Sequence, residues 1–148
     1  ELTEQDVAQL YQVRLVLERL AVTLAARNTC PANQAALNEL LDRMRAAVVT
    51  RDRPTYSRMD VETHRLIWQQ SGNRHLQRTL HAMIGPVFMF VATNAEAYDW
   101  QETLSLHEEL VACVNAGDAD SAARSIERHL DNALHRSLRA FASSAHST

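Results

Sequence analysis

An aspartate and a histidine lie one helical turn apart in the segment RMDVETHRLIWQQSGN, residues 58–73. Asp60 and His64 are four positions apart, so in a helix their side chains point the same way. The rest of that face is made of residues suited to a core: Tyr56, Met59, Thr63 and Ile67. A buried ionisable group is costly unless it is paired or bound to something. The two residues are therefore either an intrahelical ion pair or two ligands of a metal ion.

Two later histidines also fall on apolar stripes. His107 shares a face with Leu104, Leu110, Val111 and Val114. His129 shares one with Ala119, Ala122, Ile126, Leu130 and Ala133. The other four histidines are expected in solvent or in the tail: His75, His81, His135 and His146.

A single core histidine is usually satisfied by a backbone carbonyl or a hydroxyl. Three inward histidines and an aspartate without a shared partner would cost roughly 1–3 kcal/mol for each unpaired group. A metal ion bound by Asp60, His64, His107 and His129 would remove that cost. Periodicity alone leaves the ordinary core and the metal site as open alternatives.

One cation, Arg14, also lies on an apolar stripe. This first stripe consists of Val7, Leu10, Tyr11, Arg14, Leu17, Ala21 and Leu24. A long arginine can extend from a helix edge to water, or it can pair with a carboxylate elsewhere in the chain. Alternatively, its planar fork can bind the carboxylate of a ligand in a bidentate manner.

We expect helices to position these side chains. The chain contains only three Gly and three Pro, the residues that most often interrupt helices and form turns. Six helices are expected, at about 3–28, 32–50, 54–71, 74–94, 100–116 and 118–142. Thr3, Asn73 and Asp118 are expected N-caps, and Gly72 suits a left-handed position. Gly85-Pro86 should kink the fourth helix. Short connections favour antiparallel neighbours, hence an all-α antiparallel bundle of about six helices. A metal ion bound by the inward residues would lie, with its ligand, in a central cavity of this bundle.

The composition excludes several classes of protein. A length of 148 residues favours one domain, and a net charge of −3 with scattered basic residues does not predict a nucleic-acid surface. Cys30 and Cys113 lack zinc or disulfide spacing, and no membrane span or signal peptide is evident, so we expect a soluble, cytoplasmic protein.

The chain begins at Glu1 without a Met. We therefore expect a fragment of a longer protein that has a further N-terminal domain.

The order and spacing of several phrases resemble the effector-binding C-terminal domain of GntR-type transcription regulators of the FadR subgroup, called the FCD domain. The resemblance covers residues 1–148. The phrases are VRLVLERLAVTLAA at 13–26, Asp60 to His64 leading into Ser71-Gly72-Asn73, LSLHEELV at 104–111, Ala116-Gly117-Asp118, and Arg128-His129-Leu130.

The resemblance implies that Asp60, His64, His107 and His129 coordinate one divalent ion, such as Zn or Ni. All four are present, as in the metal-dependent branch of the family rather than the acyl-CoA-binding branch. Arg14 matches an arginine that family members use near the effector's carboxylate. A small organic acid, such as a hydroxy- or dicarboxylate, is the implied effector.

The family also has an N-terminal winged helix that holds operator DNA, which this sequence lacks. DNA binding is therefore expected of the parent protein and not of these residues, and symmetric operators favour a homodimer. The effector would control DNA binding allosterically, with a coupling of about 1–3 kcal/mol.

Two other functions are weighed against this one. A metal-dependent enzyme, a hydrolase or an oxygenase, could use an open coordination position. Against it, His107 and His129 lack the glutamate three residues earlier that di-metal bundles use, and no separate general base stands out. A metal-stabilised interaction domain without a small ligand stays open if Arg14 faces solvent.

Overall fold

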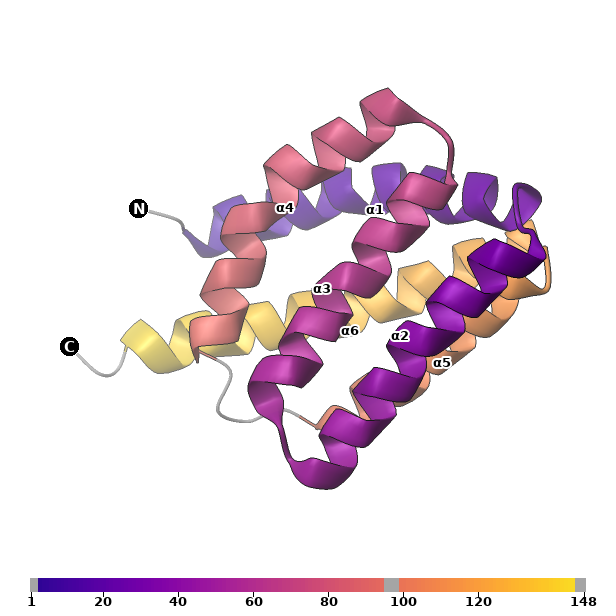
Figure 1. Cartoon of the computed structure of the whole chain (residues 1–148). Coiled ribbons are helices and arrows are strands. Elements are labelled where there is room, and N and C mark those ends of the chain that lie inside the picture. The colour runs from indigo at the N-terminus through magenta and orange to yellow at the C-terminus, as the bar shows by residue number, and fades with distance from the viewer. Residues whose placement is uncertain (1–2, 95–98, 146–148) are drawn as a thin grey trace.

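Six helices form all the regular secondary structure of residues 3–94 and 99–145, the part of the chain that the structure, a computed structural model, describes. Its side chains are described at 3–85, 99–140 and 142. The helices are α1 (Glu4–Arg27), α2 (Pro31–Thr50), α3 (Arg53–Gln70), α4 (Arg74–Asn94), α5 (Trp100–Asn115) and α6 (Ala119–Ala145). The all-α prediction is confirmed (Figure 1).

The helix starts follow the expected capping residues. Thr3 and Asp6 form a capping box at α1. Asn73 Oδ1 accepts hydrogen bonds from the first turn of α4, and Asp118 Oδ1 accepts one from the first turn of α6. Gly72 has a φ of 69°, the left-handed conformation that ends α3 without a side-chain clash. The predicted caps and the left-handed glycine are therefore confirmed.

Several helix boundaries differ from the predictions by one residue, and the end of α6 differs by three. Helix α3 begins at Arg53, ahead of Pro54, because proline is tolerated in the first turn of a helix, where its missing N–H has no partner to lose. Helix α2 likewise begins at Pro31. Helix α6 runs on to Ala145, three residues beyond the expected end. The connection at 95–98 and the tail, with His146, lie outside the described residues.

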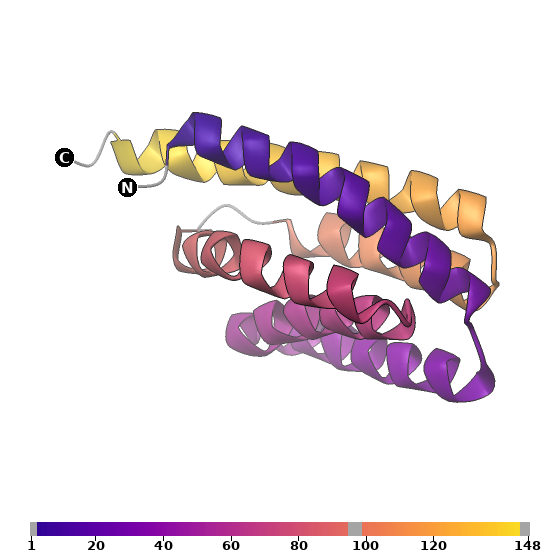
Figure 2. The ribbon, with the colours of Figure 1, turned by 90° about the horizontal axis from the view of Figure 1, so that it is seen from above.

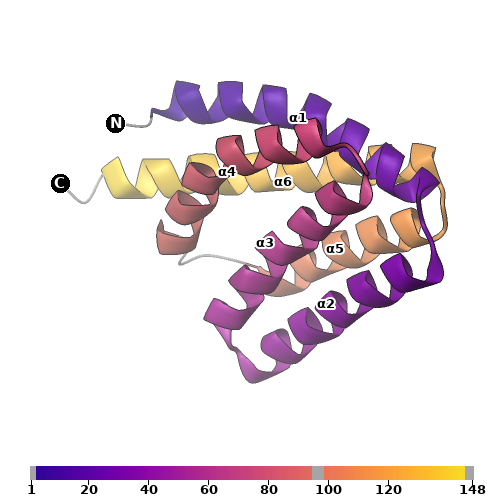
Figure 3. The ribbon, with the colours of Figure 1, turned by 45° about the horizontal axis from the view of Figure 1, so that its top comes forward.

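The helices pack as antiparallel neighbours whose contacts define the core. Helix α1 lies along α6, α5 packs on the other side of α6, and α2 packs on α3 (Figure 2). Helix α4 covers α1 and α3, and it changes direction along its length, as Gly85-Pro86 predicted (Figure 3). The first residues of α1 and the last of α6 lie at the same end of the molecule. Helices α1, α3, α5 and α6 thus surround one interior region.

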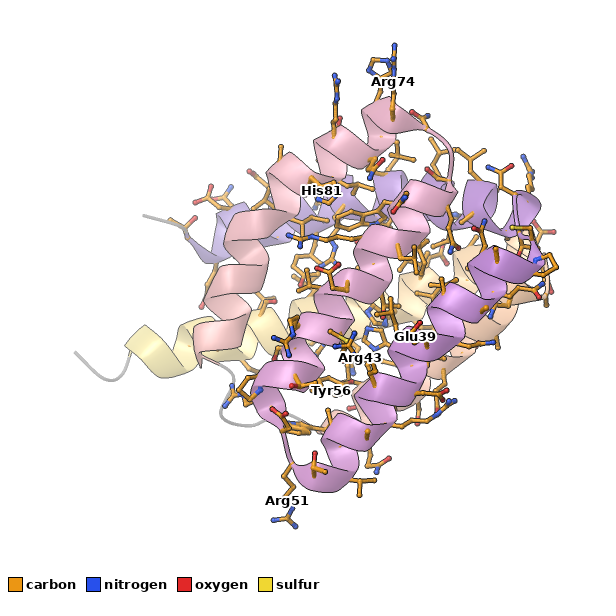
Figure 4. All side chains as sticks on the ribbon, viewed as in Figure 1. Glu39, Arg43, Arg51, Tyr56, Arg74 and His81 are labelled. Atoms are coloured by element: carbon orange, nitrogen blue, oxygen red, sulfur yellow. The ribbon has the colours of Figure 1, made fainter. Side chains whose placement is uncertain are left out.

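The polar and apolar faces of α3, α5 and α6 separate as the stripes predicted. The described interior holds large apolar side chains such as Tyr56, Trp68 and Leu37, whereas Arg51 and Arg74 project outward near the ends of α2 and α4 (Figure 4). None of the helices, over the residues described, has the length and hydropathy needed to cross a membrane. The residues that break the apolar pattern inside the bundle are those discussed next.

Candidate metal centre

Asp60, His64, His107 and His129 meet inside the bundle, from α3, α5 and α6. One ligand atom from each lies within 4.8 Å of all the others. His64, His107 and His129 are at most 2 % exposed, and the Asp60 side chain is 14 % exposed. The three stripes therefore converge as predicted, and this cluster contains all four residues that the sequence singled out as ligands.

The distances between ligand atoms suit a single ion. His107 Nε2 is 2.9 Å and His64 Nε2 is 3.6 Å from Asp60 Oδ1, while His64 Nε2 and His129 Nε2 are 3.0 Å apart. Metal–ligand bonds of about 2.0–2.1 Å in a tetrahedral site place neighbouring ligand atoms roughly 3.3 Å apart. Small side-chain shifts would bring these four atoms onto one coordination sphere.

The outer nitrogens of two histidines are held by acceptors. His107 Nδ1 donates to the Thr103 carbonyl oxygen at 2.8 Å, within α5. His64 Nδ1 donates to Glu18 Oε2 at 3.0 Å, across to α1. A neutral imidazole carries one N–H, so these contacts select the tautomers whose Nε2 lone pairs point into the cluster.

The buried atoms in and around the cluster consequently include more hydrogen-bond acceptors than donors. In these tautomers His107 Nε2 and Asp60 Oδ1 face each other as two acceptors at 2.9 Å. His129 Nδ1, which is buried, has no hydrogen-bond partner among the described residues. Facing lone pairs are unfavourable unless a cation lies between them, and either a proton or a metal ion can serve. The donor set therefore fits a divalent metal.

The charge states also suit metal binding. Burial alone would raise the pKa of Asp60, but the positive charge that His107 carries when a proton lies between its Nε2 and Asp60 Oδ1 lowers that pKa well below its ordinary value. Burial, reinforced by His107 and His64, lowers the pKa of His129 well below the usual range. Asp60 is thus anionic and His129 neutral, which are the forms in which carboxylates and imidazoles coordinate metals.

Arg14 is buried beside the centre and does not reach solvent. It is 4 % exposed, its Nε donates to Glu18 Oε1 at 2.6 Å, and its guanidinium lies 5.2 Å from the centre of the Tyr11 ring. Burial disfavours its charge, but Glu18 and Tyr11 together outweigh that effect, so the pKa of Arg14 is raised above its ordinary value. The charge of Asp60 contributes in the same direction, which places Arg14 within electrostatic reach of the centre. The condition for an interaction domain without a ligand, a solvent-facing Arg14, is not met.

Sequence reasoning missed Glu18. It is 1 % exposed and touches Arg14, His64 and Trp68. The predicted stripe of α1 followed Leu10, Leu17 and Leu24, which are only half-buried. The buried face instead repeats at Val7, Tyr11, Arg14, Glu18, Ala21 and Ala25. The available signal was the spacing of four between Arg14 and Glu18, which forms an ion pair on one helix face.

Stability at acid pH should depend on Glu18. Burial alone would raise its pKa, but Arg14 and the hydrogen bond from His64 lower it from 4.5 to about 2. Because the folded pKa is below the unfolded one, the carboxylate's contribution is complete above 4.5 and is lost as the pH falls towards 2. We expect Glu18→Gln to reduce this loss in metal-free protein, measured by urea denaturation between about pH 6 and about pH 2.5. An identical pH dependence in both proteins would contradict the assignment.

A separate open groove of about 470 Å³ lies between α2, α3 and α4. Glu39, Arg43 and His81 line it from α2 and α4 (Figure 4). On α3, Arg65 is paired with Glu62 at 2.9 Å, and both side chains are nearly half exposed. Charges of both signs alternate along this groove, so it offers a ligand no single charge to bind.

Comparison with known proteins identifies the family. The FCD domain family matches residues 9–132, so the chain belongs to it. The gluconate operon transcriptional repressor of Bacillus licheniformis is 21 % identical over 137 residues, which is 88 % of this chain and 56 % of that protein. The chain thus spans little more than half the length of this relative. The FCD family and this relative are transcription regulators of the GntR type and not enzymes, which sets the enzyme alternative aside.

Solved structures share the fold at low sequence identity. McbR/YncC of E. coli superposes with a TM-score of 0.86 at 19 % identity, over 94 % of this chain and 71 % of that one. The metal-free FCD domain of TM0439 gives a TM-score of 0.78 at 16 % identity, over 97 % and 99 % of the two chains. Because the latter is a metal-free form, the likeness supports the helical fold and says nothing in favour of an ion.

Proposed function

We propose that this FCD domain is the effector-sensing part of a bacterial transcription regulator and that it binds one divalent metal through Asp60, His64, His107 and His129. The observation that carries the proposal is the convergence of four ligand atoms from three helices within 4.8 Å. Three imidazoles and one carboxylate suit Zn, Ni and similar first-row ions. When bound, such an ion would supply a Lewis-acidic centre, and an ion that accepts five or six ligands could also bind oxygen atoms of an effector.

The effector is proposed to be a small organic acid bound on the Asp60 side of the centre. Asp60 is the least buried of the four ligands, so the centre is most accessible there. The buried guanidinium of Arg14 interacts electrostatically with Asp60 and could add a charge-assisted bond to a carboxylate. A hydroxy- or dicarboxylate could bind the metal ion with one oxygen-bearing group and Arg14 with another.

Control of DNA binding would belong to the parent protein. We propose a winged-helix domain ahead of α1, whose first residues lie at one end of the bundle (Figure 2). An effector that joins α1 to α3, α5 and α6 would change the relative stability of two arrangements of these helices. A homodimer in the cytoplasm, matching a two-fold operator, completes the proposal.

Thermal-shift measurements with small organic acids test the effector proposal. For an acid at about 100 times its dissociation constant, we expect about 2.7 kcal/mol of stabilisation. That corresponds to a rise in Tm of roughly 5–11 °C for a chain of this size. The rise should occur in protein loaded with Zn²⁺ or Ni²⁺ and be much smaller after chelation. Equal shifts with and without metal, or no shift with any acid, would contradict the proposal.

A further inference from the structure

We infer that Glu18 is a positioning residue that orients His64 towards the centre and thereby links α1 to it. The inference rests on the proposed metal centre, because its functional meaning depends on His64 being a ligand. Glu18 lies on α1, whereas the ligands lie on α3, α5 and α6. It does not itself belong to the ligand cluster.

Three donors hold the Glu18 carboxylate in one orientation. Oε1 accepts from Arg14 Nε at 2.6 Å. Oε2 accepts from His64 Nδ1 at 3.0 Å and from Trp68 Nε1 at 3.2 Å. Rotation of the carboxylate would break at least one of these buried bonds, each of which is costly to leave unmade. The carboxylate is therefore a fixed acceptor for the imidazole.

The fixed acceptor determines which nitrogen of His64 carries the hydrogen. With Nδ1–H bonded to Glu18, Nε2 presents its lone pair 3.0 Å from His129 Nε2 and 3.6 Å from Asp60 Oδ1. A carboxylate on the outer nitrogen also makes the imidazole a more basic metal ligand. Glu18 thus prepares His64 for coordination in tautomer and in ring orientation.

His64 differs from the other two histidines in how its outer nitrogen is held. The outer nitrogen of His107 is bonded within its own helix, to Thr103. That of His129 has no partner in the described part of the chain. Among the three histidines, and within the residues that the structure describes, only His64 has its outer nitrogen held by a residue of another helix. Displacement of His64 on metal binding would therefore be transmitted to α1, the helix that a preceding DNA-binding domain would join.

Two double variants isolate the hydrogen bond from the ion pair. Arg14→Met/Glu18→Gln removes both charges but keeps an acceptor oxygen for His64. Arg14→Met/Glu18→Leu removes both charges and the acceptor. Apolar replacement of both partners avoids the unpaired buried charge that a single substitution leaves. Tyr11→Phe is the stability control, because it removes a different buried bond of α1, the 3.1 Å contact with Ser137 Oγ.

Zinc affinity and the imidazole tautomer are the two readouts. Relative to the Gln double variant, the Leu double variant should bind Zn²⁺ about 10–100-fold more weakly in competition with a chelating dye. In metal-free protein, long-range ¹H–¹⁵N NMR should show that His64 loses its preference for Nδ1–H in the Leu variant only. Tyr11→Phe should match the wild type in both measurements.

The outcomes distinguish a failure of the proposed role of Glu18 from a failure of the proposed metal centre. Equal zinc affinity and equal tautomers in the two double variants would overturn the role of Glu18 while leaving the metal centre standing. If the wild-type chain binds no Zn²⁺ but the tautomer difference persists, the metal centre fails and the orientation of His64 by Glu18 is upheld.

Discussion

His107→Ala is expected to abolish stoichiometric metal binding and the stabilisation that metal confers. His107 is fully buried and supplies Nε2, so no water-exposed group can replace it. If the proposed centre binds metal, an ion at about 1,000 times its dissociation constant would stabilise the wild type by about 4 kcal/mol. The variant should lose this, which amounts to roughly 8–16 °C in Tm. Elemental analysis after gel filtration and thermal unfolding with and without chelator measure the two effects.

His75→Ala is the matched control, because His75 is exposed on α4 and lies outside the cluster. It should keep the wild-type metal content. His129→Ala, on α6, gives an independent check should the α5 variant fold poorly, and it should lose metal in the same way. Metal content that stays unchanged in both cluster variants would eliminate the proposed centre.

Much of the architecture followed from local signals in the sequence. Capping residues such as Thr3, Asn73 and Asp118 act over a few residues, so their partners could be identified without tertiary information. The stripes through His64, His107 and His129 depend only on helical periodicity, which explains why their burial was predicted. The prediction that the stripes meet was stronger than an assignment based on any single histidine, since several buried polar groups need a common partner.

The sequence could not predict which residues outside the cluster hold the candidate ligands in place. Glu18 resembles an ordinary surface residue until its position between Arg14 and His64 is seen. Its spacing of four from Arg14 indicates an ion pair, but its burial depends on how α1 packs against α3, a long-range contact that the sequence alone does not specify. The partner of Arg14 also became clear only from the structure, because the burial of Arg14 too depends on long-range packing. The open alternatives were an extended side chain, a carboxylate partner and a ligand contact, and the structure supplies the carboxylate partner without testing the ligand.

Arg14→Ala is expected to destabilise the protein more than any surface substitution. It would leave the Glu18 carboxylate 1 % exposed and without its cation. Breaking a buried pair in this way typically costs about 3–5 kcal/mol, hence a fall in Tm of roughly 6–20 °C. Arg14→Met/Glu18→Gln should recover most of the loss, because no buried charge is stranded. Urea denaturation of the wild type, the single and the double variant measures the difference.

The double variant also tests whether Arg14 binds the effector. It keeps all four ligands, so metal content should remain near that of the wild type. It lacks the guanidinium, so an organic acid that stabilises the metal-loaded wild type should stabilise it by about 1.5–3 kcal/mol less, the worth of a charged hydrogen bond. Equal stabilisation of both proteins by the acid would restrict Arg14 to its partnership with Glu18. Loss of metal in the double variant would instead mean that the buried ion pair is needed to hold the ligands in place.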